Sequence, residues 1–356
     1  MKKHSVQRAT QIRIALFLLP ILLIFAQCSR KIQDKSIIHQ GGELRISKKE
    51  NKPPLNIHFF GVTNFFIELE GKALLTDPFI SNPVSKKVVF GKIATDTSIV
   101  DSFIAAVDLK KTRMVSIGHA HYDHLMDWPY MSNFVEPDKV VFAGSETAVN
   151  TVAAYNQKLA KVQKVNDLMG NIEQPGQWIY SIDSSMRLMA FEAEHPSHFM
   201  GITLYSGHYH EALEEAPVKA KRWKMGQPLS YLVDFLDEGK IQYRIFIQTS
   251  NGEKPAGYFP KEMLINHPVD IAFLSIALKG KKIRELEEMV NYIEPQLVFL
   301  GHWENFMQEK TAPVRAVAKS NISKHWIYIK EKFPEHPEFV LPMPGSAYVV
   351  NGLTKD

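Results

Sequence analysis

The sequence contains a single cysteine, Cys28, among its 356 residues. One cysteine excludes an intramolecular disulfide framework, and it excludes the zinc modules that are built from several thiolates. Any metal site in this chain must therefore be sought among histidine and carboxylate side chains.

The sequence also lacks runs of lysine and arginine interleaved with aromatic residues, and its net charge is only +4. The basic surface expected of a nucleic-acid-binding protein is missing, so we expect no nucleic-acid partner. The remaining composition, with 45% hydrophobic and 22% charged residues, is that of a folded protein. The length allows one large domain or two small ones, and it does not indicate an oligomeric state.

No apolar run near the N-terminus is long enough to span a bilayer comfortably. Residues 14–26 are apolar apart from Pro20 and follow a basic start, whereas a membrane span takes about 20 residues. This order predicts a secretory signal over residues 1–28. Its end, Gln27-Cys28-Ser29, resembles the lipobox of bacterial lipoproteins, in which the cysteine is lipidated. The alternatives are an uncleaved N-terminal anchor and an ordinary cleaved signal.

The resemblance to a lipobox implies an extracytoplasmic protein, periplasmic or at the outer membrane, that is anchored to the membrane by lipid at Cys28. Residues 29–54 are polar, rich in lysine, glutamine and glutamate, and end in two prolines. We expect them to form a tether between the anchor and a folded domain over residues 55–356.

Strands and helices are predicted from the pattern of apolar residues in this domain. Strands are expected at 57–60, 64–69, 73–76, 114–117, 187–193, 231–235, 243–247, 271–276 and 297–300, and helices at 101–107, 145–157 and 282–292. The strands come first as hairpins and later alternate with helices, which predicts sheets covered by helices, an α/β layered domain without internal repeats. Residues 207–228 fit neither pattern and are expected to form an insertion near the functional site.

The strongest chemical signal directly follows the predicted strand 114–117. His119, His121, Asp123 and His124 place three imidazoles and one carboxylate within six residues. A strand end that turns into a loop can direct these side chains to one point, and they are the ligands that zinc prefers in the absence of thiolates. This density of ligand-type residues predicts a metal site.

This H-x-H-x-D-H run resembles the hallmark of the metallo-β-lactamase superfamily. The resemblance extends over about residues 55–350. It is strongest for the branch that contains ascorbate-6-phosphate lactonase and N-acyl-phosphatidylethanolamine phospholipase D, in which a strand pair and an LLTDP element precede the run. Here the strand pair is 60–69 and the LLTDP element is 74–78. The resemblance implies an αββα sandwich, in agreement with the layered domain.

The resemblance implies that His119 and His121 bind a first metal together with a later histidine. His195 is our candidate because it lies nearest the end of the predicted strand 187–193, and His198 is the alternative.

Asp123 and His124 would bind a second metal with His302, which follows the predicted strand 297–300. Asp77 would hold a ligand histidine in one orientation and tautomer. The alternative for Asp77 is a simple turn-forming role before Pro78.

One position departs from the superfamily pattern. The superfamily has an aspartate that bridges the two metals, whereas the equivalent stretch here, 245–252, has Ser250 at that place. A neutral hydroxyl cannot compensate the repulsion between two dications. We therefore expect a weakened second site, so that the chain holds one or two ions of zinc or another divalent metal.

The resemblance implies a metal-dependent hydrolase that uses a metal-bound water on an ester, lactone, amide or phosphodiester of a small-molecule or lipid substrate. Asp123 would be catalytic, as a metal ligand that also orients the water. The alternative function is that of a non-catalytic or degenerate member of the fold that binds metal and acts as a binding protein.

Overall fold

The computed structural model describes residues 32, 34–46, 52–156, 158–197, 203–277, 283–318 and 320–352. Cys28, the signal segment and His198 lie outside the described residues. Within these ranges, no helix is both long enough and apolar enough to cross a membrane.

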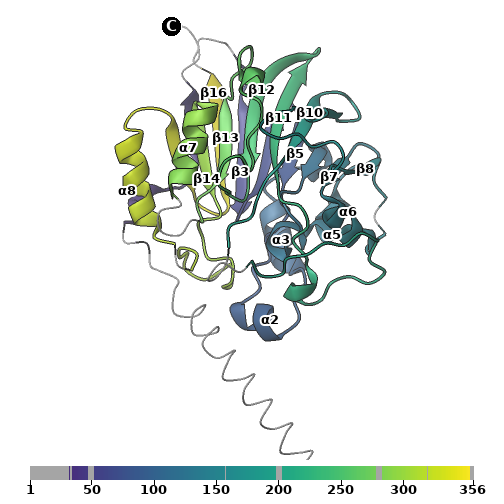
Figure 1. Cartoon of the computed structure of the whole chain (residues 1–356). Helices are drawn as coiled ribbons and strands as arrows, with labels where there is room; N and C mark the ends of the chain where they lie inside the picture. The colour runs from purple at the N-terminus through teal and green to yellow at the C-terminus, as the bar shows by residue number, and fades with distance from the viewer. Residues whose placement is uncertain are drawn as a thin grey trace, which may run out of the picture.

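Two mixed sheets form the centre of the molecule (Figure 1). In sheet I the described strands run in the order β2-β16-β3-β4-β5-β6-β7-β8, with an antiparallel part from β16 to β5 and a parallel part from β5 to β8. Their bounds are β2 Gly42–Ile46, β16 Ser346–Gly352, β3 Leu55–Gly61, β4 Asn64–Leu69, β5 Lys72–Thr76, β6 Thr112–Ser116, β7 Val141–Gly144 and β8 Lys161–Lys164.

In sheet II the described strands run in the order β1-β15-β14-β13-β12-β11-β10-β9. The strands β12 to β15 are parallel, and β9 to β12 form antiparallel pairs. Their bounds are β1 Ile38–His39, β15 Glu338–Pro342, β14 Leu297–Gly301, β13 Ile271–Ser275, β12 Lys240–Gln248, β11 Leu229–Asp237, β10 Met186–Glu192 and β9 Ile179–Tyr180.

The inner faces of the two sheets pack against each other through apolar side chains. Phe65 of β4 contacts Phe273 of β13 and Phe299 of β14, with ring centroids 4.7 and 6.1 Å apart. Successive side chains of a strand point to opposite faces of its sheet. One face of each sheet therefore contributes to this shared core, and the opposite face is covered by helices.

Helices cover both outer faces (Figure 1). On sheet II lie α7 (Ile283–Ile293) and α8 (Ile322–Lys332), whose apolar side chains share a core with that sheet. The outer face of sheet I is covered by α2 (Ser85–Phe90), α3 (Thr97–Ile104), α4 (Tyr122–Leu125), α5 (Trp128–Met131) and α6 (Glu146–Ala153). This helix–sheet–sheet–helix order confirms the predicted αββα sandwich.

The local sequence explains where these helices begin and which face they bury. Ser145 caps α6, because its hydroxyl accepts a hydrogen bond from the amide of Ala148 at 3.3 Å. In α7 the buried side chains, among them Ile283, Leu286 and Ile293, recur at intervals of three or four residues and face sheet II. The predicted helix at 101–107 is observed earlier in the chain, as α3.

Part of the segment that we expected to be a tether belongs to the sheets. Ile38 of β1 pairs with Leu341 of β15, and Leu44 of β2 pairs with Val350 of β16. Ile38, Leu44 and Ile46 are buried. These two short strands bury only a few apolar side chains. Because the other residues of 29–54 are mostly polar, the composition of the segment gave no sign of the strands. The folded part of the chain therefore begins before Leu55.

One edge of the sandwich collects the carboxyl ends of several strands. The strands β5 and β6 are parallel in sheet I, and β12, β13 and β14 are parallel in sheet II. The loops that follow β6, β10 and β14 carry His119, His195 and His302, and the residue directly after β5 is Asp77. The fold thus brings together side chains that lie far apart in the sequence.

Candidate metal centre

Six side chains form two groups of three at this edge. Each residue offers one ligand atom, and within a group these atoms lie within 4.8 Å of one another. The first group is His119, His121 and His195, and the second is Asp123, His124 and His302. The groups adjoin, because the ring centroids of His119 and His124 are 3.9 Å apart.

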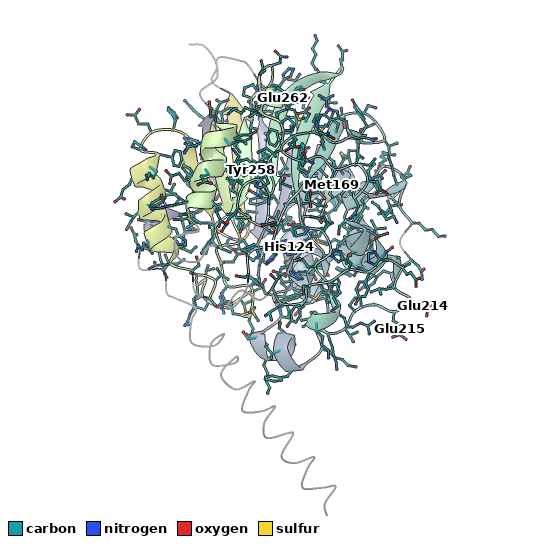
Figure 2. All side chains as sticks on the ribbon, in the orientation of Figure 1. His124, Met169, Glu214, Glu215, Tyr258 and Glu262 are labelled. Carbon is teal, nitrogen blue, oxygen red and sulfur yellow. The ribbon has the colours of Figure 1, made fainter. Side chains whose placement is uncertain are left out.

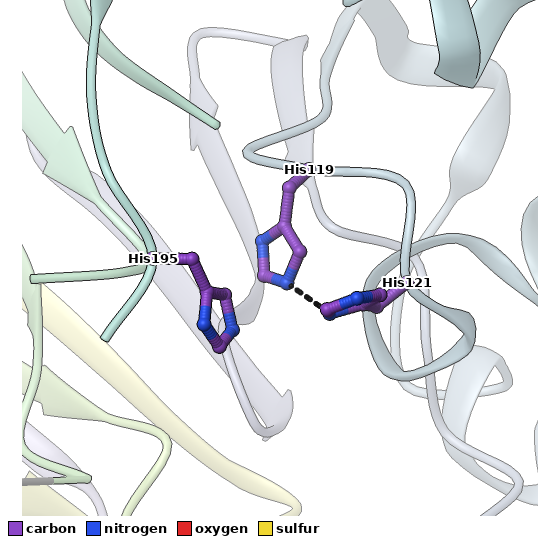
Figure 3. Close-up of side chains that lie close together, drawn as sticks. All are labelled: His119, His121 and His195. Carbon is purple, nitrogen blue, oxygen red and sulfur yellow. Dashed lines mark hydrogen bonds between the residues drawn. The ribbon is translucent and has the colours of Figure 1, made fainter. Parts of the chain in front are cut away.

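The three rings of the first group converge (Figure 3). Nε2 of His119 lies 3.0 Å from Nδ1 of His121. The ring centroid of His195 lies 4.7 Å from that of His119 and 5.2 Å from that of His121. Two nitrogens bound to one zinc at about 2.0–2.1 Å lie somewhat more than 3 Å apart, so this spacing suits a shared ion.

The second group is arranged around the carboxylate of Asp123. Its Oδ2 lies 3.7 Å from Nε2 of His124 and 3.6 Å from Nε2 of His302. His302 has a positive φ of 59°, and the residue before it is Gly301. A Cβ at Gly301 would lie 2.7 Å from the carbonyl oxygen of Val62, so only glycine allows β14 to approach this turn so closely.

A buried carboxylate fixes the orientation of His124, which lies deep in the molecule (Figure 2). Nδ1 of His124 donates to Oδ2 of Asp77 at 2.7 Å, and the hydroxyl of Thr63 donates to the same oxygen at 2.7 Å. The other oxygen of Asp77 accepts from the amide of Gly118 at 2.7 Å. The contact that we expected between Asp77 and a histidine of the run is therefore present.

The remaining nitrogen of His124, Nε2, is buried and has no hydrogen-bond partner among the described residues. In the neutral imidazole, Nδ1 carries the proton that Asp77 accepts, so Nε2 presents a lone pair near Asp123, whose Oδ2 lies 3.7 Å away. A buried lone pair without a partner is costly in an apolar interior, and a metal ion would satisfy it. The donor set therefore fits a metal.

Burial and neighbouring charges set the protonation of these groups. Burial lowers the pKa of His119, and the imidazole of His124 lowers it further. Burial also acts to lower the pKa of His124, but the carboxylates of Asp77 and Asp123 outweigh it and raise that pKa. Burial acts to raise the pKa of Asp123, but His124 and His302 outweigh it and hold that pKa well below its usual range. Asp123 is thus ionised and His119 is neutral at pH 7.

Ser250 follows β12 and contacts the first group. Its hydroxyl lies 3.3 Å from Nδ1 of His119. The neighbouring Asn251 turns away, because its amide donates to the carbonyl oxygen of Ser275 at 2.7 Å. His208, in the segment 207–228, is exposed and stacks on His210 with centroids 5.9 Å apart. Ser250 thus offers a neutral hydroxyl to the first group.

A cavity of about 550 Å³ opens beside the two groups. Four of the six side chains line it, together with Thr249 and Ser250. Further wall residues belong to 219–221 and to four segments that the sequence did not single out, which are 88–91, 204–205, 305–307 and 317–318. The expected insertion at 207–228 therefore does contribute to the site, through residues 219–221.

The structure brings together all six residues that we predicted as metal ligands, including His195 and His302 from distant loops. That they bind metal stays a prediction. Sequence reasoning missed the contact of Thr63 with Asp77. No local motif marks such a contact, which depends on how β4 and β5 pair.

The chain is similar to solved structures of metal-dependent hydrolases along most of its length. A possible metal-dependent hydrolase from Veillonella parvula is 13% identical, with a TM-score of 0.50 and coverage of 82% of this chain and 98% of that one. A metallo hydrolase from the hyperthermophilic archaeon Ignicoccus hospitalis is 17% identical, with a TM-score of 0.48 and coverage of 83% and 98%. The metallo-beta-lactamase fold protein YhfI from Bacillus subtilis is 10% identical, with a TM-score of 0.48 and coverage of 84% and 100%.

No model of a known protein family matches the sequence, and no curated protein matches it. At such low identities the similarity concerns the fold, and function must be argued from the site. The chain has the αββα sandwich that its sequence predicted, and its similarity to the Veillonella parvula structure concerns this fold alone.

Proposed function

We propose that this chain is a metal-dependent hydrolase whose metal, zinc or another divalent ion, is held by the two groups of three side chains. The observation that carries the proposal is the convergence of three histidines, His119, His121 and His195, directly beside Asp123, His124 and His302 at one end of a cavity. Imidazole and carboxylate donors suit zinc in particular.

A divalent cation at such a site lowers the pKa of water and polarises the oxygen of a carbonyl or phosphoryl group, which supplies the chemistry of hydrolysis. The chain's own residues supply the geometry. Asp77 holds His124 in the tautomer whose Nε2 is free to bind metal. The ionised Asp123 would hold metal, and its carboxylate would accept a hydrogen bond from the attacking water and so orient it, as a catalytic residue.

Two experiments test this function together. Purified protein should contain a divalent metal, and it should hydrolyse at least one substrate in a screen of simple esters, lactones, amides and phosphodiesters. His121→Ala should lose both properties, whereas His210→Ala, which changes an exposed histidine outside the two groups, should keep both.

The replacement of a bridging aspartate by Ser250 supports a second candidate function, a metal-binding protein without catalysis. In that case the metal would be present, and no member of the screen would be turned over. Absence of metal and of turnover from protein that had been supplied with zinc would refute both functions.

We also propose that the chain is a lipoprotein that is anchored on the extracytoplasmic side of a membrane through Cys28. The support is the basic and then apolar order of residues 1–28, which ends at this cysteine. Stable anchoring takes more than one acyl chain. Lipidation of a lipobox cysteine would attach several chains. Cys28→Ser should release the protein to the soluble fraction or leave an unprocessed precursor, and unchanged attachment with normal processing would contradict the proposal.

A further inference from the structure

The cavity beside the metal groups is polar at one end and apolar along its other walls. His121, Asp123, His195 and His302 form the polar end. The apolar walls include Val88, Val89, Phe90, Leu204, Phe306, Met307, Val317 and Ala318. A volume of about 550 Å³ lies within the range of about 300–1,000 Å³ that is usual for small-molecule sites.

The helix α2 is fixed as a wall of this cavity. The amide and the hydroxyl of Ser85, at its first turn, both donate to the carbonyl oxygen of Met307 at 3.0 Å. Beyond its other end, the amide of Ile93 donates to the carbonyl oxygen of Val218 at 3.0 Å. These bonds tie α2 to two other segments at the cavity mouth, so the wall is built into the fold.

Apolar side chains remain in contact with solvent at this mouth. Phe90 is 50% exposed and lines the cavity, and Val218, which directly precedes the cavity-lining Lys219, is 46% exposed. Large apolar side chains that line a cavity and are left exposed at its mouth mark a site where an apolar partner displaces water.

Few charged side chains line the cavity. Apart from the metal groups, the charged residues that line it are Lys219 and Lys221, which are exposed. No carboxylate lines the wall formed by 88–91, 306–307 and 317–318. A polar chain placed along this wall would lose its hydration without gaining partners, whereas an apolar chain would gain from leaving water.

We propose that the substrate carries an extended apolar group, an alkyl or acyl chain, that lies along α2 and Met307 while the bond to be hydrolysed lies at the metal groups. The position of the reacting bond rests on the proposed function, but the binding of the chain does not. The same chemistry is offered by a free amphiphile and by a lipid in a bilayer.

Calorimetric titration of the metal-loaded protein with n-alkylphosphonates from ethyl to decyl, below their micelle concentrations, tests this inference. The phosphonate head is the same throughout, so only the chain varies. We expect the affinity to rise about three- to fourfold per methylene, the value for full transfer from water, until the cavity is filled. An affinity that does not change with chain length would overturn the inference.

Matched variants locate the chain. Phe90→Ser and Met307→Ser should weaken binding of the decyl compound and leave that of the ethyl compound unchanged. Phe134→Ser is the control, because Phe134 is also an exposed aromatic residue, at 39%, but does not line the cavity. Equal loss in the control, or loss for the ethyl compound as well, would contradict the assignment of α2 and Met307.

The outcomes separate the two proposals. Chain-length-dependent binding with no turnover of any ester, lactone, amide or phosphodiester would support the apolar site and refute the hydrolase. Turnover without dependence on chain length would support the hydrolase and refute the apolar site. Comparing a long-chain substrate as a monomer with the same substrate in phosphatidylcholine vesicles then shows which source the site uses.

Discussion

Ser250 stands where the resemblance to the superfamily implies an aspartate that bridges two metals. Its hydroxyl contacts Nδ1 of His119 at 3.3 Å and carries no charge. The second group has one ionised carboxylate, Asp123, to balance a second dication close to the first. The repulsion between two dications is therefore incompletely compensated, and the site beside Asp123 should lose its metal first.

Ser250→Asp should raise the metal content and make the second equivalent more resistant to a mild chelator. We expect clearly fewer than two equivalents in the unaltered protein and a value nearer two in the variant, measured by elemental mass spectrometry during chelator titration. Ser98→Asp adds the same charge at an exposed position in α3 and should change nothing. Two tightly held metals before the substitution, with no effect of Ser250→Asp, would contradict this reasoning.

Asp77→Asn should weaken metal binding about 10–100-fold, which is usual when a residue that orients a metal-binding histidine is changed. The amide can no longer accept bonds on both sides from His124 and Gly118. Asp127→Asn is the matched control, since Asp127 is an equally buried carboxylate that accepts bonds from the amides of Ile80 and Ser81, away from the two groups. Both variants should lose stability, and only Asp77→Asn should lose metal affinity.

At the scale of the elements, the metal centre depends on how closely the ends of β6 and β12 approach. A Cβ at Gly118 would lie 1.9 Å from Oγ1 of Thr249 and 3.3 Å from Oδ2 of Asp77. No side chain fits there without a shift of one strand end. Gly118 therefore sets the distance between the run of histidines and the loop that carries Ser250.

Gly118→Ala should destabilise the protein by about 1–3 kcal/mol, the usual cost of overpacking a core, and should reduce its metal content. Thr249→Ala removes the oxygen that the new methyl group would strike, so the double variant should recover part of the loss. Thermal unfolding of the two single variants and the double variant measures this coupling. Simple additivity of the two single effects would show that the contact does not exist.

The sequence predicted the ligand run and the strands that carry it, but it did not predict the cavity. His119, His121, Asp123 and His124 are recognisable because four ligand-type residues follow one strand, and His302 was a candidate through the resemblance to the superfamily. Cavity walls give no such signal. Val88 and Met307 are ordinary apolar residues far apart in the chain, and the sequence does not distinguish them from core residues.

At the scale of the whole molecule, the fold was predicted from alternating strands and helices, whereas its N-terminal limit was not. The strand β1 has two residues, too few to show a periodic pattern, and β2 has five, of which only Leu44 and Ile46 are buried. The strand β1 pairs with β15, and β2 pairs with β16. Both partners come from the C-terminal part of the chain, so neighbouring residues in the sequence give no sign of these pairings. The two ends of the folded region therefore stabilise each other.

Removal of residues 1–51 should destabilise the protein relative to removal of residues 1–31. The longer truncation deletes β1 and β2 with the buried Ile38, Leu44 and Ile46, each worth roughly 1.5–3 kcal/mol when fully buried. Denaturant unfolding of the two truncated proteins measures the difference. Equal stability would show that residues 34–46 act only as a tether.

The convergence of six ligands is tested most directly by anomalous X-ray scattering from crystals of the zinc-loaded protein. We expect a strong anomalous peak about 2.0–2.1 Å from nitrogens of His119, His121 and His195. A weaker peak should lie near Asp123 and His302, because Ser250 leaves that site with less negative charge. A zinc-loaded crystal with no anomalous peak between these side chains would contradict the metal centre on which the proposed function depends.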